Sequence, residues 1–300
     1  MKNCLLSCCL AFTLLAGNIS ADQNPLQLSK RETGSLPGKT VSSTSWRSLN
    51  PKKLNLKSSA ALVMDQYGNE VYARQADTPL PIASITKLMT AMVILDASLS
   101  LDEQITIAKA DRDLIQLTAS RLETGARLTR EQMLRLALMA SENKAANALG
   151  RTWPEGEKAF IKAMNWKAKK LGMKSSRFAD PAGLDPGNVA SAEDLAKMVR
   201  AALKYPLIRE ATTTRSLQVR PYKGRGELRY VNTNRLMKNR KWAIQVSKTG
   251  YLNEAGRCLV MQVEIADQPM VIVLLNSFGK LTPYGDSNRI RKWIERGIEG

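Results

Sequence analysis

Hydrophobic residues beyond position 57 form runs typical of strands in two places. Residues 60–64 and 71–73 flank a polar turn and predict a β-hairpin. Near the end of the chain, three more runs predict a meander of strands, at 242–249, 257–265 and 270–276. Because each group of strands is too small to bury its hydrophobic residues alone, we expect the two groups to join in one antiparallel sheet.

The region between the two groups has mostly helical periodicity. Pro81 precedes a helix with apolar residues around nearly its whole circumference, which predicts a helix inside the domain. Further helices are predicted at 130–140, 157–171, 191–204 and 286–298, with Thr129 and Ser191 as N-cap residues. The predicted fold is therefore α/β of the α+β type, an antiparallel sheet of about five strands flanked by helices, with a helical subdomain.

The first 57 residues differ from the rest. Residues 1–21 have a positive start, an apolar stretch and small residues at the exit, which predicts a cleaved signal peptide. Residues 22–57 are polar and contain three prolines, so we expect a flexible leader, followed by one catalytic domain at 58–300. Charged residues and a proline interrupt the apolar region 259–275, so at most peripheral membrane contact is expected.

The amino-acid composition excludes several classes of catalytic site. The chain has no histidine, which excludes Ser-His-Asp triads, Cys-His pairs and histidine-based zinc hydrolases. We expect neither a metal nor a cofactor. Three of the four cysteines fall in the predicted signal peptide, which leaves Cys258 without an intrachain partner. The net charge of +18 predicts an anionic partner. Nucleic acid is not expected, since no basic run alternates with aromatic residues.

Ser84 and Lys87 are three residues apart on the predicted helix after Pro81, so they share one face. Lysine acts as a base near neutral pH only if its pKa falls by about three units. We expect burial to lower the pKa of Lys87, with help from a second cation, Lys248. The same spacing occurs in Ser141…Lys144 and Ser277…Lys280, but only Ser84 begins an apolar helix.

Two further motifs supply polar groups for a peptide substrate. Ser141 and Asn143 follow the helix that ends near residue 140; the hydroxyl is able to relay a proton and the amide to hold a substrate amide. Lys248, Thr249 and Gly250 end a strand, where lysine and threonine suit a carboxylate and glycine permits close approach of a ligand. The N–H groups of Tyr251 and Ser84 are the predicted oxyanion donors.

These three motifs in this order are the signature of penicillin-binding proteins and class A β-lactamases. The chain resembles the low-molecular-mass penicillin-binding proteins, specifically the D-alanyl-D-alanine endopeptidases of the penicillin-binding protein 7 type. The segments that carry the resemblance are 81–92, 136–143, 159–164, 248–251 and 255–261.

The resemblance implies a β-lactamase/transpeptidase-like fold. It further implies that Ser84 is the acyl-ester nucleophile, Lys87 the proton acceptor and Ser141 the proton relay, while Lys248 binds substrate. The implied substrates are the cross-linked peptides of peptidoglycan in the periplasm, with β-lactams as covalent inhibitors. One departure from the family pattern is Glu142, in place of the usual Asp or Gly; we expect its side chain to point away from the cleft.

Three alternatives remain open. A D-alanyl-D-alanine carboxypeptidase acting on monomeric stems would use the same motifs. A class A β-lactamase needs a glutamate on the loop 178–189, which contains only Asp180 and Asp185 as acidic residues. A non-catalytic basic module would hold anionic peptidoglycan through its charge alone.

Overall fold

The computed structural model describes residues 49–117 and 119–299, all within one compact unit. The predicted signal peptide and most of the predicted leader lie outside these residues. A five-stranded antiparallel sheet has the order β2-β1-β11-β10-β9. Its strands are β1 (Ser58–Asp65), β2 (Glu70–Arg74), β9 (Ile244–Leu252), β10 (Gly256–Ile265) and β11 (Gln268–Ser277). The hairpin and the meander are confirmed, and they join where β1 pairs with β11.

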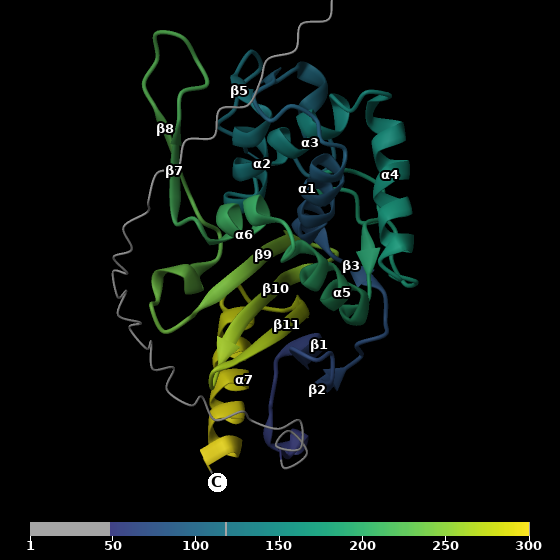
Figure 1. Cartoon of the computed structure of the whole chain (residues 1–300), viewed down its shortest axis with the longest axis vertical. Helices are drawn as coiled ribbons and strands as arrows, with labels where there is room; N and C mark the ends of the chain where they lie inside the picture. The colour runs from purple at the N-terminus through teal and green to yellow at the C-terminus, as the bar shows by residue number, and fades with distance from the viewer. Residues whose placement is uncertain (1–48, 118, 300) are drawn as a thin grey trace, which may run out of the picture. The chain divides into compact units, whose positions relative to one another are not determined.

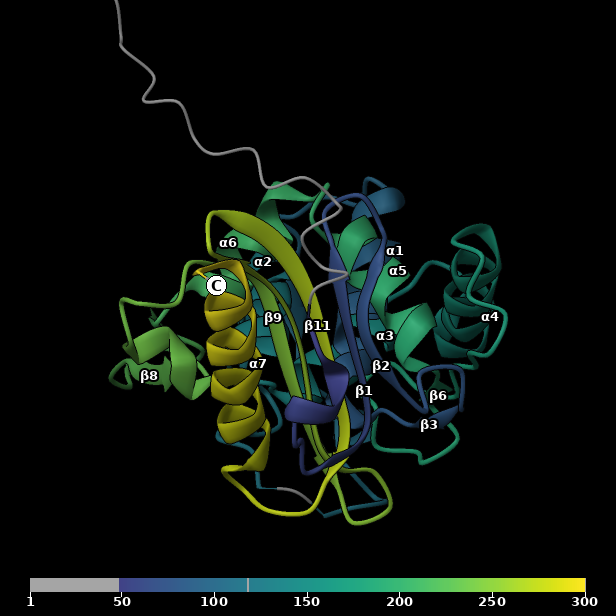
Figure 2. The same ribbon diagram turned by 90° about the horizontal axis from the view of Figure 1, so that it is seen from below.

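Alternation along β1 explains why both faces of the sheet are covered. Ala60 and Leu62 belong to the hydrophobic core on one face, whereas Ala61 and Val63 belong to the core on the other. The first core lies under the helices between β2 and β9. The second core lies under the final helix, α7 (Thr282–Glu299), which crosses the opposite face (Figures 1 and 2).

The remaining helices form the upper part of the unit in Figure 1. They are α1 (Lys87–Asp96), α2 (Arg130–Met139), α3 (Asn143–Arg151), α4 (Gly156–Lys170), α5 (Ala192–Ala202) and α6 (Pro206–Thr213). The side chains of Thr129 and Ser191 accept backbone N–H groups at the starts of α2 and α5, so both predicted caps are confirmed. Helices α3 and α6, each shorter than ten residues, were not predicted.

Three small two-stranded sheets were also missed. They pair β3 (Leu80–Pro81) with β6 (Val189–Ala190), β4 (Gln104–Thr106) with β5 (Arg127–Thr129), and β7 (Ser216–Val219) with β8 (Leu228–Val231). Their strands have two to four residues, too few for an alternating pattern to show. The first of them connects the chain just before Ser84 to the end of the loop 178–189.

Residues 49–57 fall in the segment that the sequence analysis treated as a flexible leader. Here Leu49, Leu54 and Leu56 are buried in the core beneath α7, and the indole N–H of Trp293 donates to the backbone oxygen of Asn50. Asp286 of α7 accepts the backbone N–H groups of residues 57 and 58. The packed part of the chain therefore begins before Ser58, because three spaced leucines suffice to bind this segment to the sheet.

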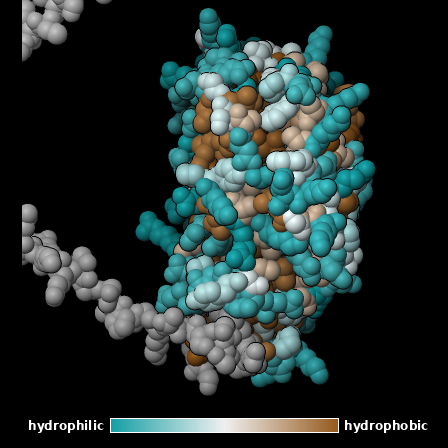
Figure 3. Space-filling view, turned by 45° about the vertical axis from the view of Figure 1, so that its right-hand side comes forward, coloured by the Kyte–Doolittle hydropathy of each residue, from teal (hydrophilic) through white to brown (hydrophobic). Residues whose placement is uncertain are grey.

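No helix within the described residues is both long and apolar enough to cross a bilayer. Hydrophilic side chains cover most of the face in Figure 3, and hydrophobic residues gather over its upper, helical part.

Candidate active site

Ser84 and Lys87 lie in a tight turn that leads into α1. Ser84 belongs to the 3-10 turn Ala83–Thr86, and Lys87 is the first residue of α1. Ala83 has a φ of 49°, a left-handed conformation that residues other than glycine rarely adopt. Such strain persists where the surroundings enforce it, often at functional sites. The turn places Lys87 Nζ 2.9 Å from Ser84 Oγ, so the predicted pair is in contact.

The amine of Lys87 has two further partners. Asn143 Oδ1 and the backbone oxygen of Ala182 each lie 2.6 Å from Nζ, and both atoms are acceptors only. A neutral amine has two hydrogens and one lone pair. The two hydrogens satisfy these two oxygens, which leaves the lone pair for the hydroxyl hydrogen of Ser84. The three contacts therefore form the arrangement that a general base requires.

Burial lowers the pKa of Lys87 from 10.5 to about 7, against the opposing effect of nearby carboxylates, Asp180 first. The side chain has no exposed surface. From the sequence, part of this lowering of the pKa of Lys87 was expected to come from Lys248. In the structure the repulsion between the two amines instead adds to burial in lowering the pKa of Lys248, well below its ordinary value.

Ser141 and Asn143 occupy the junction between α2 and α3. Ser141 has a φ of 60°, so a second residue of the site is held in the left-handed region. Its hydroxyl accepts a hydrogen bond from Lys248 Nζ at 2.9 Å. Glu142 does not line the cavity described below; its carboxylate caps the start of α3. The junction thus connects both lysines, Lys87 through Asn143 and Lys248 through Ser141.

Strand β9 brings the motif Lys248, Thr249 and Gly250 against the turn that holds Ser84. A Cβ atom at Gly250 would lie 2.9 Å from the backbone oxygen of Ile82 and 3.2 Å from Ser84 N. Only glycine allows this approach, which sets the backbone of 250–251 beside the N–H of Ser84. The hydroxyl of Thr249 is 2.7 Å from that of Thr233, and both face the cavity.

The loop 178–189 packs against the turn that holds Ser84 and is organised by one carboxylate. Asp180 accepts the backbone N–H groups of residues 182 to 185 and the side-chain amide of Asn188. Gly183 packs so tightly that a Cβ there would lie 2.0 Å from the oxygen of Ala83. Asp180 therefore fixes the position of the Ala182 oxygen that binds Lys87. A carboxylate with five hydrogen-bond donors is poorly placed to activate water.

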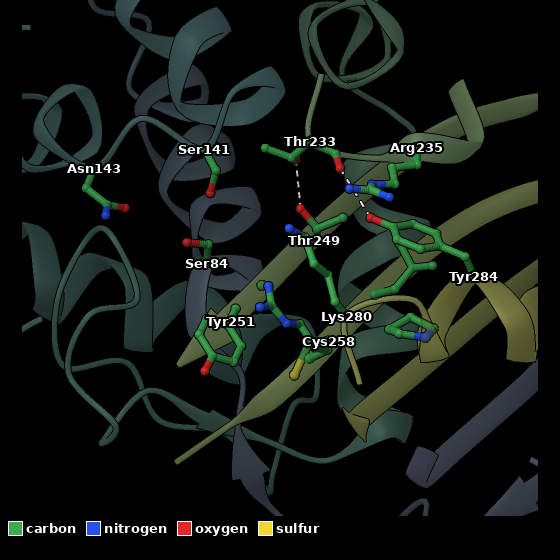
Figure 4. A pocket seen from close by; sticks show the side chains of 14 residues that line it. Ser84, Ser141, Asn143, Thr233, Arg235, Thr249, Tyr251, Cys258, Lys280 and Tyr284 are labelled. Carbon is green, nitrogen blue, oxygen red and sulfur yellow. Dashed lines mark hydrogen bonds between the residues drawn. The ribbon is translucent and has the colours of Figure 1, made fainter. Parts of the chain in front are cut away.

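These groups open onto one cavity of about 370 Å³ (Figure 4). Of the predicted residues, Ser84, Ser141, Asn143, Thr249, Gly250 and Tyr251 line it, whereas Lys87 and Lys248 are buried behind its wall. Eight further residues line the cavity and were not predicted as part of the site: Thr233, Arg235, Arg257, Cys258, Leu259, Lys280, Pro283 and Tyr284. Within residues 49–117 and 119–299, no cluster of three or more histidine, cysteine or acidic side chains is suited to a metal.

The two other serine and lysine pairs with the same spacing are not functional pairs. The amine of Lys144 donates to the backbone oxygen of Leu122, away from Ser141. The hydroxyl of Ser277 is buried 2.7 Å from that of Ser58, whereas Lys280 is exposed at the cavity. All three pairs have the same spacing, so the pair of Ser84 and Lys87 is distinguished by its position at the start of the buried helix α1.

Residues 47–279 match the family described as D-alanyl-D-alanine carboxypeptidase, peptidase family S11. The chain belongs to this family of serine DD-peptidases. It is 46% identical to a D-alanyl-D-alanine endopeptidase of Pseudomonas aeruginosa over 248 residues, which covers 82% of this chain and 80% of that protein. A D-alanyl-D-alanine endopeptidase of Escherichia coli is 44% identical and covers 81% of this chain and 78% of its own length.

The fold agrees with that of the family. A DD-transpeptidase of Streptomyces superposes with a TM-score of 0.74 at 26% identity, covering 81% of this chain and 98% of that one. The sequence-based resemblance to the D-alanyl-D-alanine endopeptidases and the predicted fold class are confirmed.

Proposed function

We propose that this protein hydrolyses the D-alanyl cross-links between peptidoglycan stem peptides through an acyl-enzyme on Ser84. The observation that carries the proposal is the contact of Ser84 Oγ with a buried lysine whose pKa is lowered to about 7. The names of the two endopeptidase relatives support the choice of substrate.

Acylation follows from the contacts. Lys87 Nζ accepts the hydroxyl proton of Ser84 while Oγ forms a bond to the D-alanyl carbonyl carbon. The N–H groups of Ser84 and Tyr251 stabilise the negative oxygen that results, each contributing about 10²- to 10³-fold in rate. The carbon–nitrogen bond then breaks. The leaving amine takes up the proton that Lys87 accepted. We assign the relay of this proton to Ser141, because its hydroxyl and that of Ser84 face the same space in Figure 4.

Deacylation adds water to the ester and returns the proton to Ser84. Asp180 is occupied by backbone donors, Asp185 accepts the backbone N–H of Gly187, and neither residue lines the cavity, so neither carboxylate of the loop 178–189 is placed to activate that water. We therefore expect β-lactams to form long-lived esters, unlike the rapid turnover of a β-lactamase. Rapid hydrolysis of nitrocefin by the pure protein would contradict this expectation.

Covalent labelling tests the nucleophile. A fluorescent penicillin should label the wild type and the control variant Ser59→Ala, whose serine is exposed on β1, but not Ser84→Ala. Labelling of Ser84→Ala, or an adduct mapped by peptide mass spectrometry to another residue, would contradict the proposal. A non-catalytic peptidoglycan-binding module predicts no labelling of any of the three proteins.

A carboxypeptidase is the second candidate, because the matching family carries that description. Purified protein is incubated separately with a cross-linked muropeptide dimer and with a monomeric pentapeptide. We expect conversion of the dimer to monomers. Release of D-alanine from the pentapeptide, with the dimer left intact, would favour the carboxypeptidase.

We also propose export to the periplasm, with at most peripheral membrane contact. The charged start, the apolar stretch and the small residues before position 22 support it. Cell fractionation should recover a processed protein in the periplasmic fraction, and the unprocessed chain in the cytoplasm would contradict export.

A further inference from the structure

A second cavity, of about 470 Å³, lies between α7 and the segment that precedes β1. Its lining residues include four cations: Lys53 of the 3-10 turn Pro51–Lys53, and Arg289, Lys292 and Arg296 of α7. Among the described residues that line this second cavity, none is acidic. The cavity is therefore strongly positive.

The segment that carries Lys53 is packed closely on α7. The indole N–H of Trp293 donates to the backbone oxygen of Asn50 at 3.0 Å. A Cβ atom at Gly297 would lie 2.0 Å from Leu49 Cδ2, so glycine at this position allows the leucine to rest on the helix backbone. These contacts fix Lys53 in the same cavity as the cations of α7.

An acidic partner within the protein accounts for only one of the four cations. Arg289 binds the buried carboxylate of Asp286 at 2.6 Å. The other three, Lys53, Lys292 and Arg296, form no ion pair with the part of the chain that the structure describes. Like charges four residues apart on a helix repel each other, as Lys292 and Arg296 do, and a bound anion removes that repulsion.

The surroundings of the cations favour a hydrated polyanion over a membrane surface. A helix that binds at a membrane inserts an apolar face below the lipid headgroups. The apolar face of α7 is not available for this, because Ile290 and Ile294 are fully buried in the core against the sheet. The side that α7 presents to the cavity carries its cations, and a cluster of cations attracts a polyanion.

Helix α7 also connects this cavity to the active site (Figure 1). Tyr284, in its first turn, lines the active-site cavity. At a rise of 1.5 Å per residue, Arg289 and Arg296 lie about 8 and 18 Å farther along the helix axis. Peptidoglycan is a polymer whose stem peptides carry carboxylates, so one segment of it is long enough to lie at both cavities.

We propose that the cavity lined by Lys53, Arg289, Lys292 and Arg296 is a secondary binding site for the peptidoglycan polymer. The site binds carboxylates of stem peptides that neighbour the cross-link being cleaved, and so keeps the enzyme on its insoluble substrate. The inference rests on the proposed function, since it requires a polymeric peptidoglycan substrate. The four residues bind polymer and take no part in the chemistry at Ser84.

Binding is measured by co-sedimentation with intact peptidoglycan sacculi, after Ser84 has been acylated with a penicillin so that the active site does not cleave the polymer. Lys53→Gln combined with Lys292→Gln should weaken binding about fivefold, the value of two exposed charge interactions. The matched control combines Lys158→Gln with Lys174→Gln, which removes the same charge from exposed positions outside the cavity. The control should bind as the wild type does.

Hydrolysis supplies a second readout. The measured quantity is the rate on intact sacculi divided by kcat/KM on a soluble cross-linked dimer, which has no polymer beyond the cleaved cross-link. This ratio should fall about fivefold in the variant at positions 53 and 292 and keep its wild-type value in the control. Thermal unfolding of each variant confirms that it is folded.

Equal binding of the two double variants to sacculi would overturn the inference. So would a variant at positions 53 and 292 that keeps its binding to sacculi but loses binding to phosphatidylglycerol vesicles, since the cavity would then recognise a membrane surface. Failure of the proposed function has a different signature. Wild-type protein would then show no penicillin adduct on Ser84 and would not cleave the dimer, whatever its affinity for sacculi.

Discussion

Lys87 Nζ lies 2.9 Å from Ser84 Oγ, and its two other hydrogen-bond partners are oxygens that only accept. The fold achieves this contact by burying an amine beneath the loop 178–189 and the α2–α3 junction. Burial destabilises the charged form of the Lys87 amine more than its neutral form. This lowers the pKa of Lys87 into the range where lysine accepts a proton from a hydroxyl near neutral pH. The chain has no histidine, and Lys87 thereby holds the position relative to the serine that an imidazole has in other serine hydrolases.

The first prediction concerns the pH dependence of acylation. Lys87 accepts a proton only when neutral, and its pKa is lowered to about 7. The second-order rate constant for a β-lactam should therefore rise about tenfold per pH unit well below pH 7 and level off above it. Stopped-flow measurement of acylation over this range checks the profile. A rate that still rises steeply between about pH 8 and pH 10 would mean that the pKa of Lys87 is near that of free lysine.

Asp180→Asn should affect both the loop and the base. Asparagine keeps one acceptor oxygen, so about half of the backbone N–H groups that Asp180 holds lose their partner, and the free energy of unfolding should fall by about 2 kcal/mol. The substitution also removes the carboxylate that contributes most to raising the pKa of Lys87. The midpoint of the acylation profile should move to lower pH.

Urea unfolding and the acylation profile measure the two effects of Asp180→Asn separately. Asp185→Asn is the matched control, since Asp185 lies in the same loop but is not among the causes of the Lys87 shift. A profile that shifts equally in both variants would contradict the role assigned to Asp180.

Gly250→Ala tests the approach of β9 to Ser84. The added Cβ would lie within 3.2 Å of three atoms of residues 82–84, two of them backbone, so the strand must move. We expect the acylation rate to fall about 100-fold, which is the effect of losing one oxyanion donor. Gly226→Ala is the control, because nothing lies within 4 Å of its Cβ position. Equal acylation rates for the two variants would show that this close approach does not position the N–H of Tyr251.

Much of the fold could be predicted from the sequence because its strands and long helices have strong periodic patterns. Each of the meander strands β9, β10 and β11 was anticipated from its apolar run, to within two or three residues at its ends. By contrast, α3 has only nine residues, four of them alanine or glycine, and follows a serine with positive φ, so its pattern covers too few turns to be recognised. Leu49, Leu54 and Leu56 were missed for a related reason: three leucines in a polar segment form no recognisable period.

In the candidate site too, features set by neighbouring residues were predictable, whereas contacts between distant segments were not. The motif residues were found because each motif is contiguous. The Ala182 oxygen that binds Lys87 has no side-chain signature, since any residue supplies a backbone carbonyl. Arg235, Arg257 and Lys280 come from three separate segments and meet only when the sheet has formed. Asp180 was noticed only as an acidic residue of its loop; its structural role depends on a loop conformation that the sequence does not display.

The central claim is that the buried amine of Lys87 is largely neutral near physiological pH in the uninhibited protein. Nuclear magnetic resonance of protein labelled with ¹³C at the lysine ε carbon, assigned with Lys87→Met, measures this directly. The account predicts a titration midpoint for Lys87 of about 7. A midpoint above about 9.5, close to that of an exposed lysine, would contradict it.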